Sequence, residues 1–308
     1  MRNIRFIQFP HPGREHRVSP GASCKQWNPL RTPAGTDNPH ARTFFQVSGK
    51  RVTRDSKEQI PGLLWAWGEW EAEASVVKSL EATGHEPFTL FKPYWKKKEK
   101  FDNHHNTDPF VFGGFYYTDC KQGTSSSLMG MLELDIGSVI IFGSGESYAN
   151  EARWVVDTVF VVREFIDHDD SNYKNLLSNK TPPGYDQIVL GPIYGPCAPK
   201  PRRPRPRRRL YIGATFENQL DGMFSFFPCM AAGSRGNRGF ARPQIKISRD
   251  LTERHFNPKL RQGMKGQGQL TERLTPCAIK SLWVEICKQV QEEGCDLGVW
   301  ADPPCQRD

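Results

Sequence analysis

Gly137-Ser-Val-Ile-Ile-Phe-Gly143 is followed, after a loop rich in Gly, Ser and Asn, by Trp154-Val-Val-Asp-Thr-Val-Phe-Val-Val162. Both runs consist mainly of β-branched and aromatic residues, whose side chains pack well on a pleated surface. Two such runs joined by turn-forming residues predict a hairpin of adjacent buried strands. Asp157 stands inside the second run, and a buried carboxylate must be satisfied by hydrogen bonds or used chemically. A structural role for Asp157 is the simpler expectation.

Outside this hairpin the sequence also favours short strands. Apolar runs bounded by turn-forming residues occur at 4–9, 44–47, 63–67, 88–91, 110–117, 210–216 and 222–227. They do not alternate regularly with helical segments, so a doubly wound parallel sheet is disfavoured. The sequence predicts an α+β fold around a mixed or antiparallel sheet, with few helices and long loops.

Two segments have helical periodicity. Over residues 71–82, Ala74, Val77 and Leu80 recur at the spacing of one helix face. Near the C-terminus, Thr275 is a suitable N-cap, Pro276 a suitable first residue and Gly294 a suitable stop for an amphipathic helix. That helix is expected to be part of the core.

Length and composition set further bounds. The 308 residues, 37% hydrophobic, predict one folded domain over 1–308, with residues of about 165–209 crossing the surface. The chain has no run of 18 apolar residues and starts without a signal-peptide pattern, so we expect a cytoplasmic protein that does not enter a membrane. Its eight cysteines form no Cys-x-x-Cys pair, which indicates neither a zinc ribbon nor a redox motif.

The most basic segment is Lys200-Pro-Arg-Arg-Pro-Arg-Pro-Arg-Arg-Arg209, called here the arginine tract. Arginine grips phosphate with a planar fork, and proline keeps the segment extended, so DNA or RNA is the natural partner. A disordered, solubilising linker is the alternative. The chain carries a net charge of +8, and the tract supplies most of that excess. The expected nucleic-acid contacts are Arg202, Arg203, Arg205, Arg207, Arg208 and Arg209, with Arg235 and Arg238 from a glycine-rich loop.

Three segments carry candidate site residues. Phe9-Pro-His-Pro-Gly-Arg-Glu-His16 presents His11, Arg14, Glu15 and His16 after a strand, a set suited to holding phosphate or a base edge. The same residues could start a metal site, although their spacing is not that of a helical zincin. We expect no metal and no cofactor.

The second segment is Leu64-Trp-Ala-Trp-Gly-Glu-Trp-Glu71. In a strand, Trp67 and Glu69 would share one face, and the indole would desolvate the carboxylate and suit it to proton transfer. The intervening glycine favours an exposed bend. The alternative is that the tryptophans are core residues and the glutamates face solvent.

The third segment is His104-His-Asn-Thr-Asp-Pro-Phe-Val-Phe-Gly113. Its Asn106 could read a base edge and its Asp108 could orient a water, while the neighbouring Phe110 could stack on a base. Asn-Thr-Asp-Pro is also ordinary turn chemistry.

These segments together resemble a group of uncharacterised bacterial proteins over most of residues 4–162. The strands at 137–162 are similar to PUA-like (ASCH and EVE) domains, which read modified bases, and Asp108-Pro-Phe resembles the Asp-Pro-Tyr of uracil-DNA glycosylases. The chain also resembles bacterial phage-defence DNA glycosylases that excise glucosylated hydroxymethylcytosine. It departs from the established glycosylases in having neither a helix-hairpin-helix nor a complete uracil-glycosylase motif.

The resemblance implies an enzyme that flips a modified base out of phage DNA and hydrolyses its N-glycosidic bond. Asp108 or Glu69 would then position water and stabilise the sugar cation, while His11, Arg14 and His16 would hold the phosphate or the departing base. A non-catalytic reader of modified bases and a metal-dependent nuclease are the alternatives. The sequence leaves the oligomeric state open.

Overall fold

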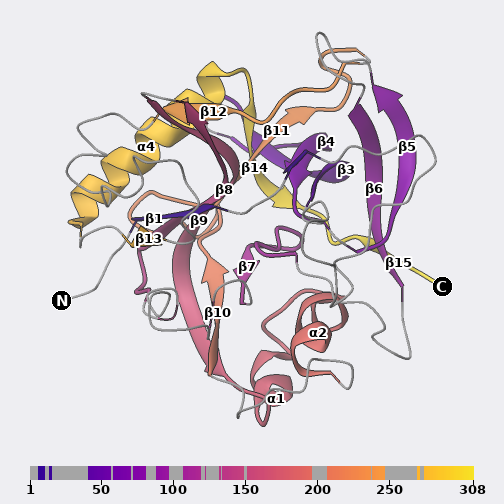
Figure 1. Cartoon of the computed structure of the whole chain (residues 1–308), viewed down its shortest axis with the longest axis vertical. Coiled ribbons are helices and arrows are strands. Elements are labelled where there is room, and N and C mark those ends of the chain that lie inside the picture. Colours follow the sequence, from indigo (N-terminus) through magenta and orange to yellow (C-terminus); the bar gives the residue numbers. More distant parts are fainter. Residues whose placement is uncertain are drawn as a thin grey trace.

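The structure of the chain is a computed structural model. It describes residues 6–10, 14–15, 41–56, 58–70, 72–80, 88–96, 107–118, 122, 132, 134–148, 151–195, 207–236, 238–246, 269–270 and 274–308. The described part consists mainly of strands with few helices, which confirms the predicted α+β class (Figure 1). Its strands form two mixed sheets.

The first sheet is built on the predicted hairpin. Ile140 of β8 pairs with Phe160 of β9, and both side chains are buried. Pairing continues to Tyr148 opposite Glu151, so the strands reach well into the segment expected to be a loop. The sheet order is β13 (Gln269–Leu270), β1 (Phe6–Pro10), β8 (Val139–Tyr148), β9 (Glu151–His168), β10 (Arg208–Gly213) and β7 (Tyr116–Tyr117), with β12 (Gln244–Lys246) also on β9.

The second sheet contains a small closed ring. β3 (Ala41–Val52) pairs with β4 (Ile60–Gly68), β4 with β11 (Phe227–Ala231), β11 with β14 (Asp296–Ala301), and β14 returns to β3. Closure removes free strand edges from these four strands. Outside the ring lie β6 (Phe88–Lys96), β2 (Arg14–Glu15), β5 (Ala74–Leu80) and β15 (Cys305–Arg307).

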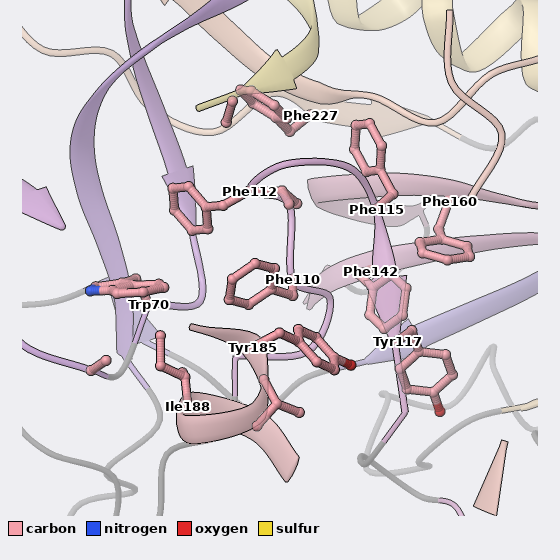
Figure 2. Close-up of a cluster of buried hydrophobic side chains, with 14 of the residues drawn as sticks. Trp70, Phe110, Phe112, Phe115, Tyr117, Phe142, Phe160, Tyr185, Ile188 and Phe227 are labelled. Atoms are coloured by element: carbon pink, nitrogen blue, oxygen red, sulfur yellow. The ribbon is translucent and has the colours of Figure 1, made fainter. Parts of the chain in front are cut away.

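The two sheets meet where the chain enters β11. Phe226 exchanges two backbone hydrogen bonds with Val159 of β9, of 2.8 and 2.9 Å, and Phe227 then pairs within the ring. Two clusters of buried apolar side chains fill the interior. The first, drawn in Figure 2, is rich in aromatic rings and lies around residues 110–117 and 185–194.

The C-terminal helix α4 (Pro276–Glu292) forms as predicted. Thr275 accepts a hydrogen bond from the Ala278 N–H, and Gly294 ends the helix at a positive φ of 81°. Its apolar stripe, including Ile279 and Val290, is buried in the second cluster. None of the helices in the described part of the chain has the length and apolar character needed to cross a bilayer.

The helix predicted over 71–82 is wrong. Residues Ala74–Leu80 form β5, which pairs antiparallel with β6. The register shifts between Val76 and Lys78, so Ala74 and Leu80 are buried in different clusters while Val77 is exposed. The helical spacing of three apolar residues was therefore coincidental, because pairing with β6 overrides a local pattern this short.

The expected surface excursion at 165–209 also differs from the structure. Residues up to His168 extend β9, and they are followed by α1 (Tyr173–Leu177), the π-helical turn η2 (Asp186–Leu190) and α2 (Gly191–Tyr194). Tyr185, Ile188 and Leu190 are buried in the first cluster. In Figure 1, α1 and α2 lie near the end of β9 and the start of β10, and their apolar side chains add to the core there.

Candidate functional site

Trp67 lies in the core. Only 3% of it is exposed, its Nε1 donates to the Phe240 carbonyl oxygen at 2.6 Å, and its ring centroid is 4.8 Å from that of Phe44. This is the packing of a buried indole with its polar edge satisfied. The described conformation therefore supports the core interpretation of Trp67 over a base-stacking one.

Phe110 is also surrounded by other rings. Its centroid lies 5.1 Å from that of Tyr185 and 6.2 Å from that of Trp70, and Figure 2 shows it between these two side chains. Trp67 and Phe110 belong to different clusters, so the fold does not bring the two candidate stacking residues into one group.

Glu69 follows β4 and is 6% exposed. The preceding Gly68 is buried rather than part of an exposed bend. A Cβ at position 68 would lie 2.9 Å from Cε1 of Phe45, so this glycine is explained by close packing of the neighbouring strand. Glu69 is therefore a buried carboxylate, in contrast to the solvent-facing alternative.

Asp108 is placed by a tight reversal of the chain. Gly113 and Gly114 adopt positive φ angles of 69° and 131°, and Phe110 and Tyr116 then exchange two backbone hydrogen bonds of 2.8 Å. This antiparallel register sets Asp108 opposite Thr118. Asp108 has no exposed surface, and its Oδ1 accepts a hydrogen bond from the Thr118 N–H at 3.4 Å.

A buried polar chain continues from Thr118. Its Oγ1 lies 2.9 Å from Nε2 of His168, the last residue of β9, and Nδ1 of His168 lies 2.9 Å from the hydroxyl of Tyr194 in α2. We call Asp108, Thr118, His168 and Tyr194 the polar chain. Three separate segments supply it, so it exists only because the tertiary fold brings them together.

The imidazole of this chain is neutral at pH 7. Burial, and then the positive charge of Arg208, lower the pKa of His168 from 6.5 to about 4, with a partial opposing effect from Asp169. A neutral imidazole has one N–H donor and one acceptor nitrogen. The hydroxyls of Thr118 and Tyr194 can each donate or accept, so both ring nitrogens are satisfied in either tautomer.

The end of the arginine tract enters β10 beside this chain. Arg208 pairs in register with His168, and Arg209 with Asp167. Because side chains alternate across a strand, Arg208 lies on the His168 face while Arg207 and Arg209 lie on the Asp167 face. Arg208 Nη1 donates to the Gln122 carbonyl oxygen at 3.4 Å.

Arg209 contacts Asp167, Phe165 and Gln122 within the protein. Its guanidinium donates to both carboxylate oxygens of Asp167, at 2.7 and 3.1 Å, and lies 3.8 Å from the ring centroid of Phe165. The side-chain amide of Gln122 pairs with the backbone N–H and C=O of Arg209, both at 2.8 Å, as a neighbouring strand would. Arg209 is therefore an anchor within the protein.

The second basic segment is separate from the tract. Gly233 and Gly236 adopt positive φ angles, and the exposed Arg235 places its Nη2 beside Gly294, where α4 ends. A cation is favourable at a helix C-terminus. Arg238 is exposed in the same loop. Since α4 and the start of β10 lie at different ends of the molecule (Figure 1), the described arginines of the tract, Arg207 to Arg209, are apart from Arg235 and Arg238.

Several predicted site residues lie outside the described residues. They are His11, His16, Asn106, Arg202, Arg203 and Arg205. The backbone of Arg14 and Glu15 forms β2, which pairs in parallel with β3. Within the described ranges, no three His, Cys, Asp or Glu side chains gather closely enough to hold a metal ion.

Asp157 has a structural partner. Its Oδ1 accepts a hydrogen bond from Arg242 Nη1 at 2.8 Å, and side-chain exposures of 2% and 5% bury the pair. The backbone of the same loop bonds to β9 through the Val156 N–H and the Pro243 carbonyl oxygen at 3.0 Å. The ion pair thus fastens this loop over β9.

Sequence reasoning missed Thr118, His168 and Tyr194. The available signal was the Gly113-Gly114 pair between aromatic runs, which indicates a reversal and hence a partner opposite Asp108. Nothing local points to His168 or Tyr194. Comparison with known proteins adds no residues, because no family model, no curated protein and no solved structure matches the chain.

Proposed function

We propose that the protein binds DNA through the arginine tract and hydrolyses the N-glycosidic bond of a flipped, modified base, with Asp108 as the catalytic carboxylate. One observation carries this proposal: Asp108 belongs to a buried polar chain that ends beside the described end of the arginine tract. Of the candidate carboxylates, Asp108 is the one with this position.

Burying such a chain opposes folding. A buried hydroxyl or amide without partners costs about 1–3 kcal/mol, and a buried charge costs more. Three segments nevertheless bring a carboxyl, a hydroxyl, an imidazole and a phenol together at one place. Groups whose pKa is strongly shifted by burial, as that of His168 is, gather preferentially at functional sites.

The chemistry suits glycoside cleavage. The sugar becomes cationic as its bond to the base breaks, and a carboxylate held close by stabilises that charge without reorganising. The neutral His168 has a basic ring nitrogen, so it can accept the proton that the attacking water loses. Asp108 has no exposed surface, so the proposal requires DNA binding to uncover it.

The same burial favours a second candidate function. Asp108 and Glu69 are both enclosed, and Trp67 and Phe110 pack as core residues. A non-catalytic reader of modified bases needs no accessible carboxylate. It would share the arginine tract, and it would bind modified DNA without releasing a base.

The test is base release. The purified full chain is incubated, with EDTA present, with unmodified phage DNA and with DNA containing glucosylated hydroxymethylcytosine. Released bases are identified by mass spectrometry and abasic sites by alkaline cleavage. Asp108→Asn is the decisive variant, because it keeps the oxygen that accepts from Thr118 and removes only the charge. Glu69→Gln is the matched control for loss of a buried carboxylate.

Release of modified base by the wild type, lost in Asp108→Asn at unchanged thermal stability, is the expected result. Equal release by wild type and Asp108→Asn would move the catalytic role elsewhere, to Glu69 if Glu69→Gln is inactive. If the protein bound modified DNA but released no base, the proposed glycosylase would be rejected in favour of a non-catalytic reader of modified bases.

A further inference from the structure

At the end of β9, the guanidinium groups of Arg207 and Arg209 share the carboxylate of Asp167. Asp167 Oδ2 accepts from both Arg207 and Arg209, and its Oδ1 accepts from Arg209 alone. One positive charge in this group of three is therefore not neutralised by Asp167. Such a group attracts a further anion.

The two arginines differ in how firmly they are held. Side-chain exposure is 12% for Arg209 and 64% for Arg207. Arg209 makes the full two-bond fork with Asp167 and also lies over Phe165, whereas Arg207 makes one contact with Oδ2. An exposed ion pair of this kind contributes little to stability, so a competing anion can displace it.

We propose that Arg207 is a phosphate-binding residue of the arginine tract, and that in the free protein Asp167 occupies the place which a nucleic-acid phosphate takes in the complex. Arg209 keeps Asp167 in both states and fixes the point from which the tract extends. This inference rests on the proposed binding of DNA by the tract, but not on catalysis.

Asp167 then opposes binding in a specific way. The phosphate must compete with a carboxylate for the Arg207 guanidinium, and the carboxylate also repels the DNA backbone. Removing the charge of Asp167 should therefore strengthen binding, whereas removing the charge of Arg207 should weaken it. Both effects concern phosphate, so they should be independent of base modification.

The experiment measures binding of the full chain to a short duplex of unmodified DNA over a series of salt concentrations. Its variants are Asp167→Asn, Arg207→Gln and the combination of both. Asp170→Asn is the matched control. Asp170 is exposed and lies three residues from Asp167, and its substitution by Asn removes one negative charge, as Asp167→Asn does. Thermal melting confirms that each variant is folded.

We expect Asp167→Asn to tighten binding about two- to fivefold, as displacement of an exposed ion pair predicts, and Asp170→Asn to have a smaller effect. Arg207→Gln should weaken binding and reduce the slope of log affinity against log salt by about 1. The gain from Asp167→Asn should disappear when Arg207 is already Gln.

Equal gains in DNA affinity from Asp167→Asn and Asp170→Asn would overturn the inference, because the gain would then come from the change in net charge and not from the contact between Asp167 and Arg207. An unchanged salt slope in Arg207→Gln would also overturn it. If the wild-type chain binds no DNA at any salt concentration, DNA binding by the tract itself fails, and the two failures are thereby distinguished.

Discussion

Asp157 and Asp108 are two buried carboxylates that are satisfied in different ways. Asp157 lies within β9 and pairs with Arg242 from the loop that leads into β12. Asp108 lies opposite Thr118 and connects through it to the neutral His168 at the end of β9. The first is a buried pair of opposite charges, and the second accepts from the backbone N–H of a residue whose hydroxyl contacts a neutral imidazole.

This difference shows that burial of a carboxylate does not by itself indicate a functional site. A partner of opposite charge satisfies Asp157 and fastens a loop, which is a structural role. Asp108 accepts from the backbone N–H of Thr118, and the Thr118 hydroxyl contacts His168, which pairs in register with Arg208 at the end of the arginine tract. If the two carboxylates differ in this way, substitutions at Asp157 and along the polar chain will have effects of different size.

The largest effect is expected for the ion pair. Asp157→Ala should lower the free energy of unfolding by about 3–5 kcal/mol, because it leaves the Arg242 charge buried without its carboxylate. Urea denaturation measures the loss. The double variant Asp157→Leu with Arg242→Met should regain part of it, since no buried charge remains. A loss below about 1 kcal/mol in Asp157→Ala would remove the structural half of the comparison.

The next effect concerns the pH dependence of stability. The pKa of His168 is about 4 in the folded chain and 6.5 when unfolded, so the unfolded chain binds more protons between these values. Stability contributed by the neutral imidazole is therefore present above pH 6.5 and falls, by up to about 3 kcal/mol, as the pH drops towards 4. Denaturation at pH 7 and pH 4.5 should show a smaller loss for His168→Gln than for wild type. Equal losses would contradict a buried, neutral His168.

A smaller effect is expected within the polar chain. Thr118→Val keeps the shape of the side chain and the backbone N–H that faces Asp108, but it removes the hydroxyl partner of His168 Nε2. The expected loss is about 1–3 kcal/mol, measured by urea denaturation. Thr118→Ser retains the hydroxyl and should lose less. If the Thr118→Val and Thr118→Ser variants had the same free energy of unfolding, the hydrogen bond between residue 118 and His168 would not contribute to stability.

The smallest effect is expected at the surface. Lys288 and Glu292 form an exposed pair one turn apart on α4, with 59% and 45% side-chain exposure. Lys288→Ala should change the free energy of unfolding by no more than about 0.5 kcal/mol. This variant is the reference for an exposed ion pair. If it lowered the free energy of unfolding as much as Asp157→Ala does, burial would not explain the strength of the Asp157–Arg242 pair.

Local patterns predicted the elements whose stabilising contacts lie close in sequence. The helix α4 begins after the Thr275 cap and ends at Gly294, because capping and left-handed glycine act within one turn. The hairpin of β8 and β9 follows from two β-branched runs and a short connection. The segment Ala74–Leu80 was mispredicted because its partner, β6, is not visible in a local helical spacing.

The candidate site was predictable only in part. Asp108 was identified from its segment, and the structure gives it a buried place opposite Thr118. The chosen aromatics, Trp67 and Phe110, are core residues in the described conformation, because large rings near strands are more often used to fill space. Catalysis, DNA binding and the roles of Asp108 and Glu69 stay predictions.

The sequence by itself determined the class of the fold, the hairpin at its centre, the capped helix at its end and the concentration of positive charge in the arginine tract. These properties depend on residue type and on spacing within a few residues. Only the tertiary structure decided that β3 and β14 close a ring, that Asp157 meets Arg242, and that His168 joins Thr118 to Tyr194. Such partners are far apart in the chain, and pairing between them is selected by the packing of the whole core rather than by any local pattern.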